Sequence, residues 1–301
     1  MEYFYLAHSV SSLICLRNLI NKKHAPSLVI IHKNYESENL AKDFYKPINK
    51  LCSLYKIKLI ESDNLSDIKD RIKNFDVGIC VGYMNILRKD FFEIPNYGIF
   101  NLHCGKLPKY RGRAPISRTI KNGDKDLVIT LHKMDEGVDS GDIAVENKIR
   151  ITLKDDVNSL YKKFSDNSHK PIIELLNQLK RNKIKLKKQR IPAGSKPYRK
   201  LTEAECRIDW SRSQKDIFNQ IRALKFPYPG AFSELNGNKY FLLNSNLSKA
   251  KSTHKPGVIN KIENGNIYMN TKDFVLKISD VYNVNKKINV KKEFQTGEQF
   301  I

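Results

Sequence analysis

The stretch YGIFNLHCGKLPKYRGRAP, residues 97–115, runs from apolar residues directly into a polar and basic segment. Its first part, 97–103, predicts a buried strand, because a short apolar run bounded by turn residues is typical of strands covered on both faces. Asn101 and His103 lie two positions apart in this run, so their side chains point to the same face of the sheet. The sequence therefore predicts an amide beside an imidazole at the end of a strand.

Comparable apolar runs precede this stretch and alternate with amphipathic segments. They predict further buried strands at 3–7, 27–31, 57–60 and 77–82, and helices at 11–22, 37–54 and 65–74. Alternating strands and helices indicate a mostly parallel sheet with helices on both faces, the α/β class. Ligands in such folds bind at the carboxyl ends of the strands, and we expect His103 at one of these ends.

The chain changes character near residue 180. Before that point, 115–122 and 155–180 predict helices and 127–134 predicts a strand. Between 180 and 200, ten of 21 residues are Lys or Arg and none is acidic, and prolines interrupt any regular element, which favours a linker. Beyond it, short runs separated by Asn and Gly, with a hairpin turn at Asn236-Gly237, predict a β-rich domain. We therefore expect a catalytic domain at 1–190, a linker at 191–202 and a second domain at 203–301.

The composition limits the classes of function. The 301 residues carry a formal net charge of +22, which suits nucleic acid, an anionic membrane or phosphorylated substrates; an AT-rich genome, which favours Lys, Asn and Ile, is the alternative explanation. Five cysteines are scattered without a CxxC motif, so we expect a reducing cytoplasm and neither disulfides nor a zinc site. No stretch has the pattern of a signal peptide or a membrane-spanning helix. These features predict a cytoplasmic protein.

The loop DEGVDSGD at 135–142 contains acidic residues that suggest two chemistries. As a calcium loop it fails, because Gly137 stands where a ligand is needed and strands rather than helices are predicted on both sides. In the other interpretation Asp139 orients His103 and stabilises its cation, while Asn101 donates to a developing oxyanion. This arrangement predicts acyl transfer. The alternative is that Asn101 and His103 are ordinary hydrogen-bonded residues at a strand end.

The sequence gives less support for a catalytic role of the other candidate residues. Cys104 follows His103 directly and so points to the opposite face, which predicts packing rather than a nucleophile. We expect His8 and His132 to be structural or surface residues. The chain has neither a Walker loop nor a GxGxxG motif, so nucleotide hydrolysis and simple dinucleotide binding lack support.

Several motifs resemble those of the folate-dependent formyltransferases. NLHCGKLPKYRGRAP at 101–115 resembles the signature N-x-H-x-S-L-L-P-x-Y-R-G-x-x-P, and MDEGVDSGDI at 134–143 resembles M-D-x-G-x-D-x-G-D-I. Residues 200–232 are similar to the start of the C-terminal domain that methionyl-tRNA and sugar N-formyltransferases share. The resemblance covers nearly the whole chain. It implies a Rossmann-like catalytic domain with a mostly parallel sheet, a smaller OB-like β-rich domain and N10-formyltetrahydrofolate as co-substrate, without a metal.

Carried over by position, the resemblance implies roles for individual residues. The acceptor amine attacks the formyl carbon, His103 removes its proton, Asn101 stabilises the tetrahedral oxyanion and Asp139 holds the imidazole. Gly105 and Lys106 stand where the signature has Ser-Leu, as in the sugar-modifying branch, which puts any hydroxyl contact at Gly105 in doubt. The resemblance also implies that the pterin lies against two loops, with contacts from Tyr83, Met84, Ile86, Leu87, Asp135 and Val138.

The identity of the acceptor amine depends on smaller differences. Methionyl-tRNA formyltransferases carry a basic G-R-G-K-like loop after the second strand, and HKNYESENLAKDFYKPINK at 32–50 lacks it. The RGRAP and PYPGAF segments resemble enzymes that formylate nucleotide-linked amino sugars. The preferred interpretation is therefore a sugar N-formyltransferase acting on a dTDP- or UDP-linked amino-dideoxy sugar, as in O-antigen biosynthesis. Lys106, Arg111 and Arg113 would then face the diphosphate.

Two alternatives stay open. One is a methionyl-tRNA formyltransferase, and the other is a catalytically inactive homologue that binds nucleic acid. The inactive homologue would explain the charge but not why all three catalytic positions are filled. Under the preferred interpretation we expect no nucleic acid and no membrane as partners, and a homodimer is compatible with it.

Overall fold

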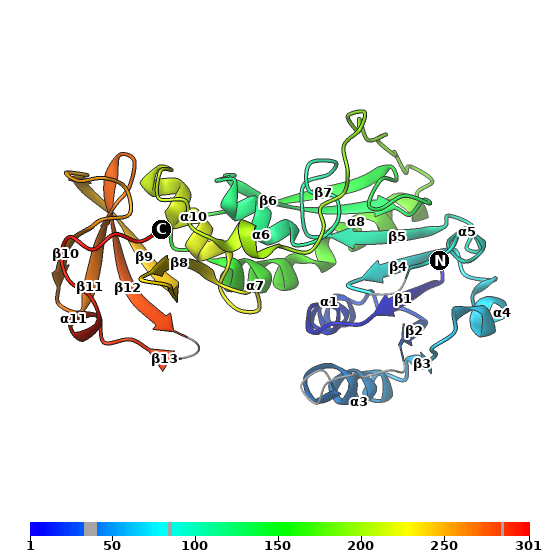
Figure 1. The fold of residues 1–301 in the computed structure, drawn as a ribbon. Coiled ribbons are helices and arrows are strands. Elements are labelled where there is room, and N and C mark those ends of the chain that lie inside the picture. Colours follow the sequence, from blue (N-terminus) through cyan, green and yellow to red (C-terminus); the bar gives the residue numbers. More distant parts are fainter. Residues whose placement is uncertain (33–40, 84–85, 284–285) are drawn as a thin grey trace. The chain divides into compact units, whose positions relative to one another are not determined.

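The computed structural model describes residues 1–32, 41–83, 86–283 and 286–301. They form two compact units (Figure 1), each of which is considered by itself. The first unit contains 1–115, 126–150 and 161–198, and the second contains 116–125, 151–160 and 199–301.

The first unit is built on a seven-stranded sheet with the strand order β3-β2-β1-β4-β5-β6-β7. The strands span Tyr3–Ala7 (β1), Leu28–Ile31 (β2), Lys58–Glu61 (β3), Val77–Val81 (β4), Ile99–His103 (β5), Asp126–Lys133 (β6) and Ile143–Arg150 (β7). Neighbouring strands from β3 to β5 pair in parallel, whereas β6 runs antiparallel to both β5 and β7. The predicted mostly parallel α/β sheet is confirmed.

Helices cover both faces of this sheet, which explains why all five residues of β1 are buried. Successive side chains of a strand point to opposite faces. Phe4 packs in one cluster with Ile72 and Phe91, whereas the Tyr5 hydroxyl on the other face donates to the Ser12 carbonyl at 2.9 Å. The first helix, α1, begins where Ser9 and Ser12 form a reciprocal capping box. The helical segments that pack in this unit include α1 (Val10–Asn21), η1 (Ala41–Tyr45), α3 (Lys46–Leu54), η2 (Leu65–Ile68), α4 (Lys69–Ile72), α5 (Lys89–Phe92) and α8 (His169–Lys180).

Two predicted helices differ in detail from the structure. The segment 155–180, expected as one helix, forms α7 (Val157–Asn167) and α8. The break has a physical cause, because Pro171 lacks the N–H that would bond the Asn167 carbonyl, and the buried Ser168 hydroxyl donates to the Ser165 carbonyl at 2.7 Å. The part of the expected helix 37–54 that is described, from Ala41 on, is helical; residues 37–40 lie outside the described residues.

The second unit is β-rich, as predicted, and its strands pair antiparallel. Its sheet has the order β10-β11-β12-β9-β8, and β13 pairs with β12. Asn236 and Gly237 join β8 and β9 with positive φ values of 50° and 76°, which are the backbone angles that a tight hairpin turn requires. The closer likeness to an OB fold stays a prediction. The strands are β8 (Ala231–Leu235), β9 (Asn238–Lys251), β10 (Ile259–Glu263), β11 (Asn266–Asn270), β12 (Phe274–Asn283) and β13 (Lys286–Lys287). The remaining helices of the described residues are α6 (Pro115–Lys121), α9 (Glu203–Cys206), α10 (Gln214–Ala223) and α11 (Val290–Glu293).

A helix that crosses a bilayer must be both long and apolar. Among the helices of the described residues, none is long and apolar enough to do so.

Candidate active site

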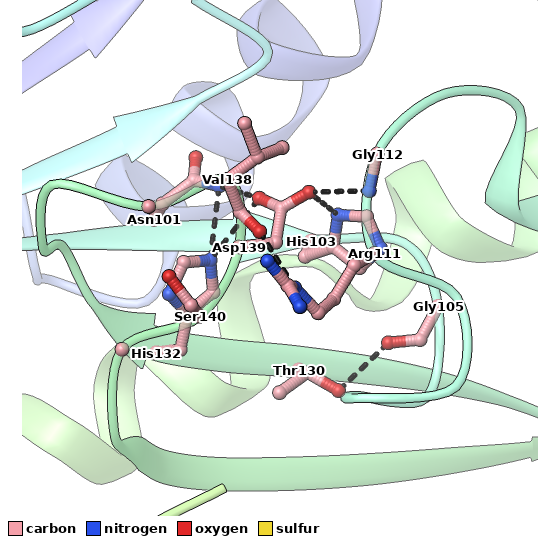
Figure 2. Close-up of polar contacts among 12 residues, drawn as sticks. Asn101, His103, Gly105, Arg111, Gly112, Thr130, His132, Val138, Asp139 and Ser140 are labelled. Carbon is pink, nitrogen blue, oxygen red and sulfur yellow. Dashed lines mark hydrogen bonds and ion pairs between the residues drawn. The ribbon is translucent and has the colours of Figure 1, made fainter. Parts of the chain in front are cut away.

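The candidate active site lies entirely in the first unit, where β5 ends and the β6–β7 loop returns. Asn101 and His103 occupy the last part of β5, and their antiparallel neighbours on β6 are His132 and Thr130. The loop between β6 and β7 brings Asp139 over the same face. Figure 2 shows the Asp139 carboxylate between the imidazoles of His103 and His132. Three residues that the sequence analysis singled out, Asn101, His103 and Asp139, are thus neighbours in space.

The hydrogen bonds of His103 determine where its proton sits. Nε2 lies 2.8 Å from the Tyr110 carbonyl oxygen, and a carbonyl can only accept, so Nε2 carries a hydrogen. Nδ1 lies 3.4 Å from Asp139 Oδ2. In the neutral imidazole the unshared electron pair is therefore on Nδ1, and a proton taken up there is held beside a carboxylate.

The environment of His103 keeps its imidazole neutral. The side chain is only 7% exposed, and this burial lowers its pKa; the Asp139 carboxylate opposes the shift, His132 adds to it and the Tyr110 carbonyl opposes it. The net effect is a pKa below the ordinary value of 6.5. A neutral, buried imidazole near pH 7 is the form that can act as a general base.

Asp139 stays ionised although it is largely buried. Burial by itself disfavours the charged carboxylate, but the imidazoles of His132 and His103 and the Gly112 amide outweigh that effect and hold the pKa of Asp139 well below its usual range. The Gly112 N–H donates to Asp139 Oδ2 at 2.8 Å. Asp139 adopts a positive φ of 48°, a conformation that aspartate tolerates better than most residues. The loop geometry therefore directs a permanent negative charge at His103.

His132 also lies in the site, although the sequence analysis placed it among structural or surface residues. Its Nδ1 lies 3.0 Å from the Lys133 carbonyl, so Nδ1 carries the hydrogen and Nε2 can accept from Asn101 Nδ2 at 3.2 Å. Asn101 Nδ2 also lies 3.4 Å from Asp139 Oδ1. His132 is 2% exposed. The alternation within 127–134 indicated a strand, but only the antiparallel register of β6 on β5 brings His132 opposite Asn101.

The loop after β5 packs too closely on His103 for a side chain at position 105. A Cβ added to Gly105 would lie 2.7 Å from Pro115 Cβ and 3.1 Å from His103 Nε2. The Gly105 carbonyl accepts from Thr130 Oγ1 at 2.8 Å, which fixes the backbone in this place. A hydroxyl-bearing residue would therefore displace the loop.

Cys104 behaves as a packing residue. It is half-buried, and burial raises the pKa of its thiol to about 12. A thiol with so high a pKa is a poor nucleophile near neutral pH, which agrees with the expected packing role of Cys104, although the residue follows β5 rather than lying in it.

The residues expected around the pterin lie in different surroundings. Ile86 is 91% exposed and Val138 is 54% exposed, whereas Leu87 is buried in a core cluster against which Tyr83 also packs. Asp135 Oδ1 accepts from Ser140 Oγ at 2.7 Å and so closes the β6–β7 loop on itself. Met84 lies outside the described residues.

The three residues expected to bind phosphate, Lys106, Arg111 and Arg113, also lie in different surroundings. Arg111 donates from Nε to the Val138 carbonyl at 2.8 Å, so it braces the loop that carries Asp139. Lys106 and Arg113 are exposed. Among the residues that the structure describes, no group of three or more His, Cys, Asp or Glu is arranged to hold a metal ion.

Comparisons with known proteins show which family the chain is similar to. The family model described as formyl transferase matches residues 11–176, and the model of the formyl transferase C-terminal domain matches 200–299. The methionyl-tRNA formyltransferase of Fusobacterium nucleatum is 32% identical over 251 residues, covering 81% of this chain and 80% of that protein. The methionyl-tRNA formyltransferase of Kosmotoga olearia is 30% identical over 278 residues, covering 91% and 89%.

A solved structure shows the same fold. The N-formyltransferase from Helicobacter canadensis, in complex with folinic acid and dTDP-3-aminofucose, superposes with a TM-score of 0.71 at 20% identity, covering 94% of this chain and all of that one. At this level of identity the likeness is one of fold. Together with the sequence matches over both domains, it leads to one conclusion: the chain belongs to the formyl transferase family.

Proposed function

We propose that this protein transfers a formyl group from N10-formyltetrahydrofolate to the amine of methionyl-tRNA. The observation that carries the choice of acceptor is the similarity to methionyl-tRNA formyltransferases over 80% or more of this chain. The sequence motifs by themselves favour an amino sugar as the acceptor and no nucleic acid as a partner. The relatives support the alternative, methionyl-tRNA, better, and so does the net charge of +22, because a polyanionic acceptor is attracted by such a surface.

The proposed chemistry uses the geometry of His103 and Asp139. The acceptor nitrogen attacks the formyl carbon, and its proton passes to Nδ1 of His103, the atom that lies 3.4 Å from the Asp139 carboxylate. The bond between the formyl carbon and N10 of the folate then breaks, and N10 receives a proton. One amide bond forms and one breaks, so no oxidant or reductant is needed.

Asn101 is proposed to stabilise the oxyanion of the tetrahedral intermediate. Its Nδ2 carries two hydrogens, and both contacts in the structure are long, at 3.2 Å to His132 and 3.4 Å to Asp139. We propose that the hydrogen in the longer of these contacts, to Asp139, turns to the oxyanion when the intermediate forms.

The segment 180–200 supports a large anionic acceptor. It borders the site, because Tyr198 accepts from Arg113 N at 2.9 Å and donates to the Arg111 carbonyl at 2.8 Å. The part of the segment that belongs to the first unit, 180–198, has exposed basic side chains at Lys180, Arg181, Lys183, Lys185, Lys187, Lys188, Arg190 and Lys196. Exposed Lys and Arg next to the site are what phosphate contacts with RNA require.

A nucleotide-linked amino sugar is the second candidate acceptor. Position 105 has no room for a side chain, and a glycine there resembles the variant of the sugar-modifying branch. Gly105-Lys106 replaces the Ser-Leu of the broad signature, and the basic loop expected of tRNA enzymes is missing from the sequence at 32–50. Lys106 and Arg113, both exposed, would then face the diphosphate.

The experiment offers methionyl-tRNA and dTDP- and UDP-linked amino sugars to the purified protein in parallel with the same formyl donor. Two results together support the proposal. The protein formylates methionyl-tRNA, and its affinity for methionyl-tRNA falls as the salt concentration rises from about 50 to 200 mM. Formamido sugar without formylated methionyl-tRNA would establish the second candidate instead. Formylation of neither acceptor would leave the inactive homologue as the explanation.

A further inference from the structure

Gln189 contacts the loop that carries Asp139, from a segment that the sequence analysis placed at the end of the catalytic domain. The backbone just before it is fixed, because Lys187 and Ile143 at the start of β7 exchange two hydrogen bonds of 2.8 and 2.9 Å. This pairing brings the Gln189 side chain under the β6–β7 loop. The side chain is 8% exposed.

The amide of Gln189 binds two carbonyl groups of that loop. Its Nε2 donates to the Asp139 carbonyl at 3.0 Å and to the Gly141 carbonyl at 2.7 Å. Both hydrogens of the amide are therefore used on the backbone on either side of Ser140. We propose that Gln189 is a positioning residue for formyl transfer, which holds the loop so that the Asp139 carboxylate faces His103. This inference rests on the proposed role of the His103–Asp139 pair, but not on which acceptor is used.

The loop needs such a support because its conformation is unusual. Asp139 has a positive φ of 48°. At Gly141 a Cβ would lie 1.9 Å from the Lys133 carbonyl oxygen, so the backbone passes very close to the end of β6. A single donor group that binds both carbonyls compensates for this strained path.

Packing alone does not explain a glutamine at this position. Its Oε1 is buried and has no hydrogen-bond partner in the described part of the chain. A buried acceptor without a partner is destabilising, and an apolar side chain of the same length would avoid that cost. The hydrogen bonds from Nε2 are therefore what the position requires.

The same segment also supports Asp139 from the other side. The Gly112 N–H donates to the Asp139 carboxylate at 2.8 Å, and Gly112 itself pairs with Tyr198. A Cβ at Gly112 would lie 2.4 Å from the Tyr198 carbonyl oxygen. Residues 187–198 thus hold the backbone of Asp139 through Gln189 and its carboxylate through Gly112.

The test compares Gln189→Met and Gln189→Glu with Gln178→Met. Gln178 is a matched control, because its Oε1 is also buried without a partner among the described residues, and its Nε2 donates to the Glu174 carboxylate at 3.2 Å, away from the Asp139 loop. Methionine keeps the length of the side chain without its donors, and ionised glutamate keeps the shape but repels the two carbonyls. We expect kcat to fall about 10²-fold in both Gln189 variants, as for a misplaced catalytic group, with KM for the donor within about twofold of wild type.

A second readout does not depend on turnover. The groups that face His103 are Asp139, which raises its pKa, His132, which lowers it, and the Tyr110 carbonyl. If Gln189 positions Asp139, its loss weakens the influence that raises the His103 pKa. NMR titration of labelled histidine should then show a lower His103 pKa in Gln189→Met and an unchanged His103 pKa in Gln178→Met.

The outcomes separate this inference from the proposed function. A wild-type protein that formylates no acceptor contradicts the proposed function, and the titration then decides on Gln189 alone. An unchanged His103 pKa in folded Gln189→Met and Gln189→Glu would overturn the inference, as would equal loss of turnover in the Gln178 control.

Discussion

The carboxylate of Asp139 lies 3.4 Å from Nδ1 of His103, while the other ring nitrogen of His103 is 2.8 Å from the Tyr110 carbonyl. The carbonyl fixes the tautomer and the carboxylate faces the atom that is left to accept a proton. This is the arrangement in which a base gains a proton and the resulting cation is stabilised where it forms. The pH dependence of the reaction should report it.

The rate of formyl transfer should depend on pH through the protonation of His103. A base works only when it is unprotonated, so kcat/KM should fall as pH drops through the His103 pKa, which burial places below 6.5. Asp139→Asn removes the charge that raises this pKa. The acid limb should therefore move to lower pH, while the plateau falls by about 10²-fold because the imidazole is less well oriented. A limb that moves to higher pH would contradict the assignment.

Asn101 and His132 should act together. Asn101→Ala is expected to lower kcat by about 10²- to 10³-fold, as for an oxyanion donor, and His132→Leu by less. Because Asn101 Nδ2 lies 3.2 Å from His132 Nε2, the two losses should not add, and a double-mutant cycle should give a coupling of about 0.5–3 kcal/mol. Additive losses would show that His132 acts only through packing.

Gly105→Ala should impair both stability and turnover. Its Cβ would lie 2.7 Å from Pro115 Cβ and 3.1 Å from His103 Nε2, and such overpacking costs about 1–3 kcal/mol. Gly265→Ala is the control, because it has open space but a φ of 74° and so costs about 1–2 kcal/mol through backbone strain alone. Chemical denaturation should show a loss in both variants and kinetics a loss only at position 105. Normal kcat in Gly105→Ala would show that the loop tolerates a side chain.

The basic segment should determine the salt dependence of acceptor binding. Replacing Lys185 and Lys188 with serine removes two exposed charges and should reduce the slope of log affinity against log salt by about 1 for each phosphate that the variant no longer binds. The control replaces Lys50 and Lys58, which are also exposed but lie within α3 and β3, respectively, at the opposite end of the sheet from β7. Equal slopes in all three proteins would show that 180–200 does not touch the acceptor.

The sheet could be predicted from the sequence because its signals are local. Buried parallel strands appear as continuous apolar runs, and their helices as amphipathic segments between them. The break between α7 and α8 could not be predicted with the same ease, because the helical pattern continues through Ser168 and only Pro171 disturbs it. The parts of the site on one strand, Asn101 and His103, followed from a spacing of two.

The rest of the site depends on long-range pairing that periodicity does not contain. His132 reaches Asn101 only through the antiparallel register of β6 on β5. Gln189 reaches the Asp139 loop only because Lys187 pairs with Ile143. In the sequence, the many basic residues around Gln189 predict a linker instead of a segment that supports the site. Leu87 shows the opposite case, since it was expected at the pterin but is buried in the core cluster. Its place against the folate stays a prediction.

The most direct test of the account follows a labelled formyl group from N10-formyltetrahydrofolate to methionyl-tRNA with wild type, His103→Ala and His254→Gln, the last an exposed histidine of the second unit. We predict transfer by wild type and His254→Gln at equal rates, and a rate about 10²- to 10⁴-fold lower for His103→Ala, as for the loss of a general base, with unchanged donor binding. Label transfer by His103→Ala at more than a third of the wild-type rate would show that His103 is not the group that accepts the proton.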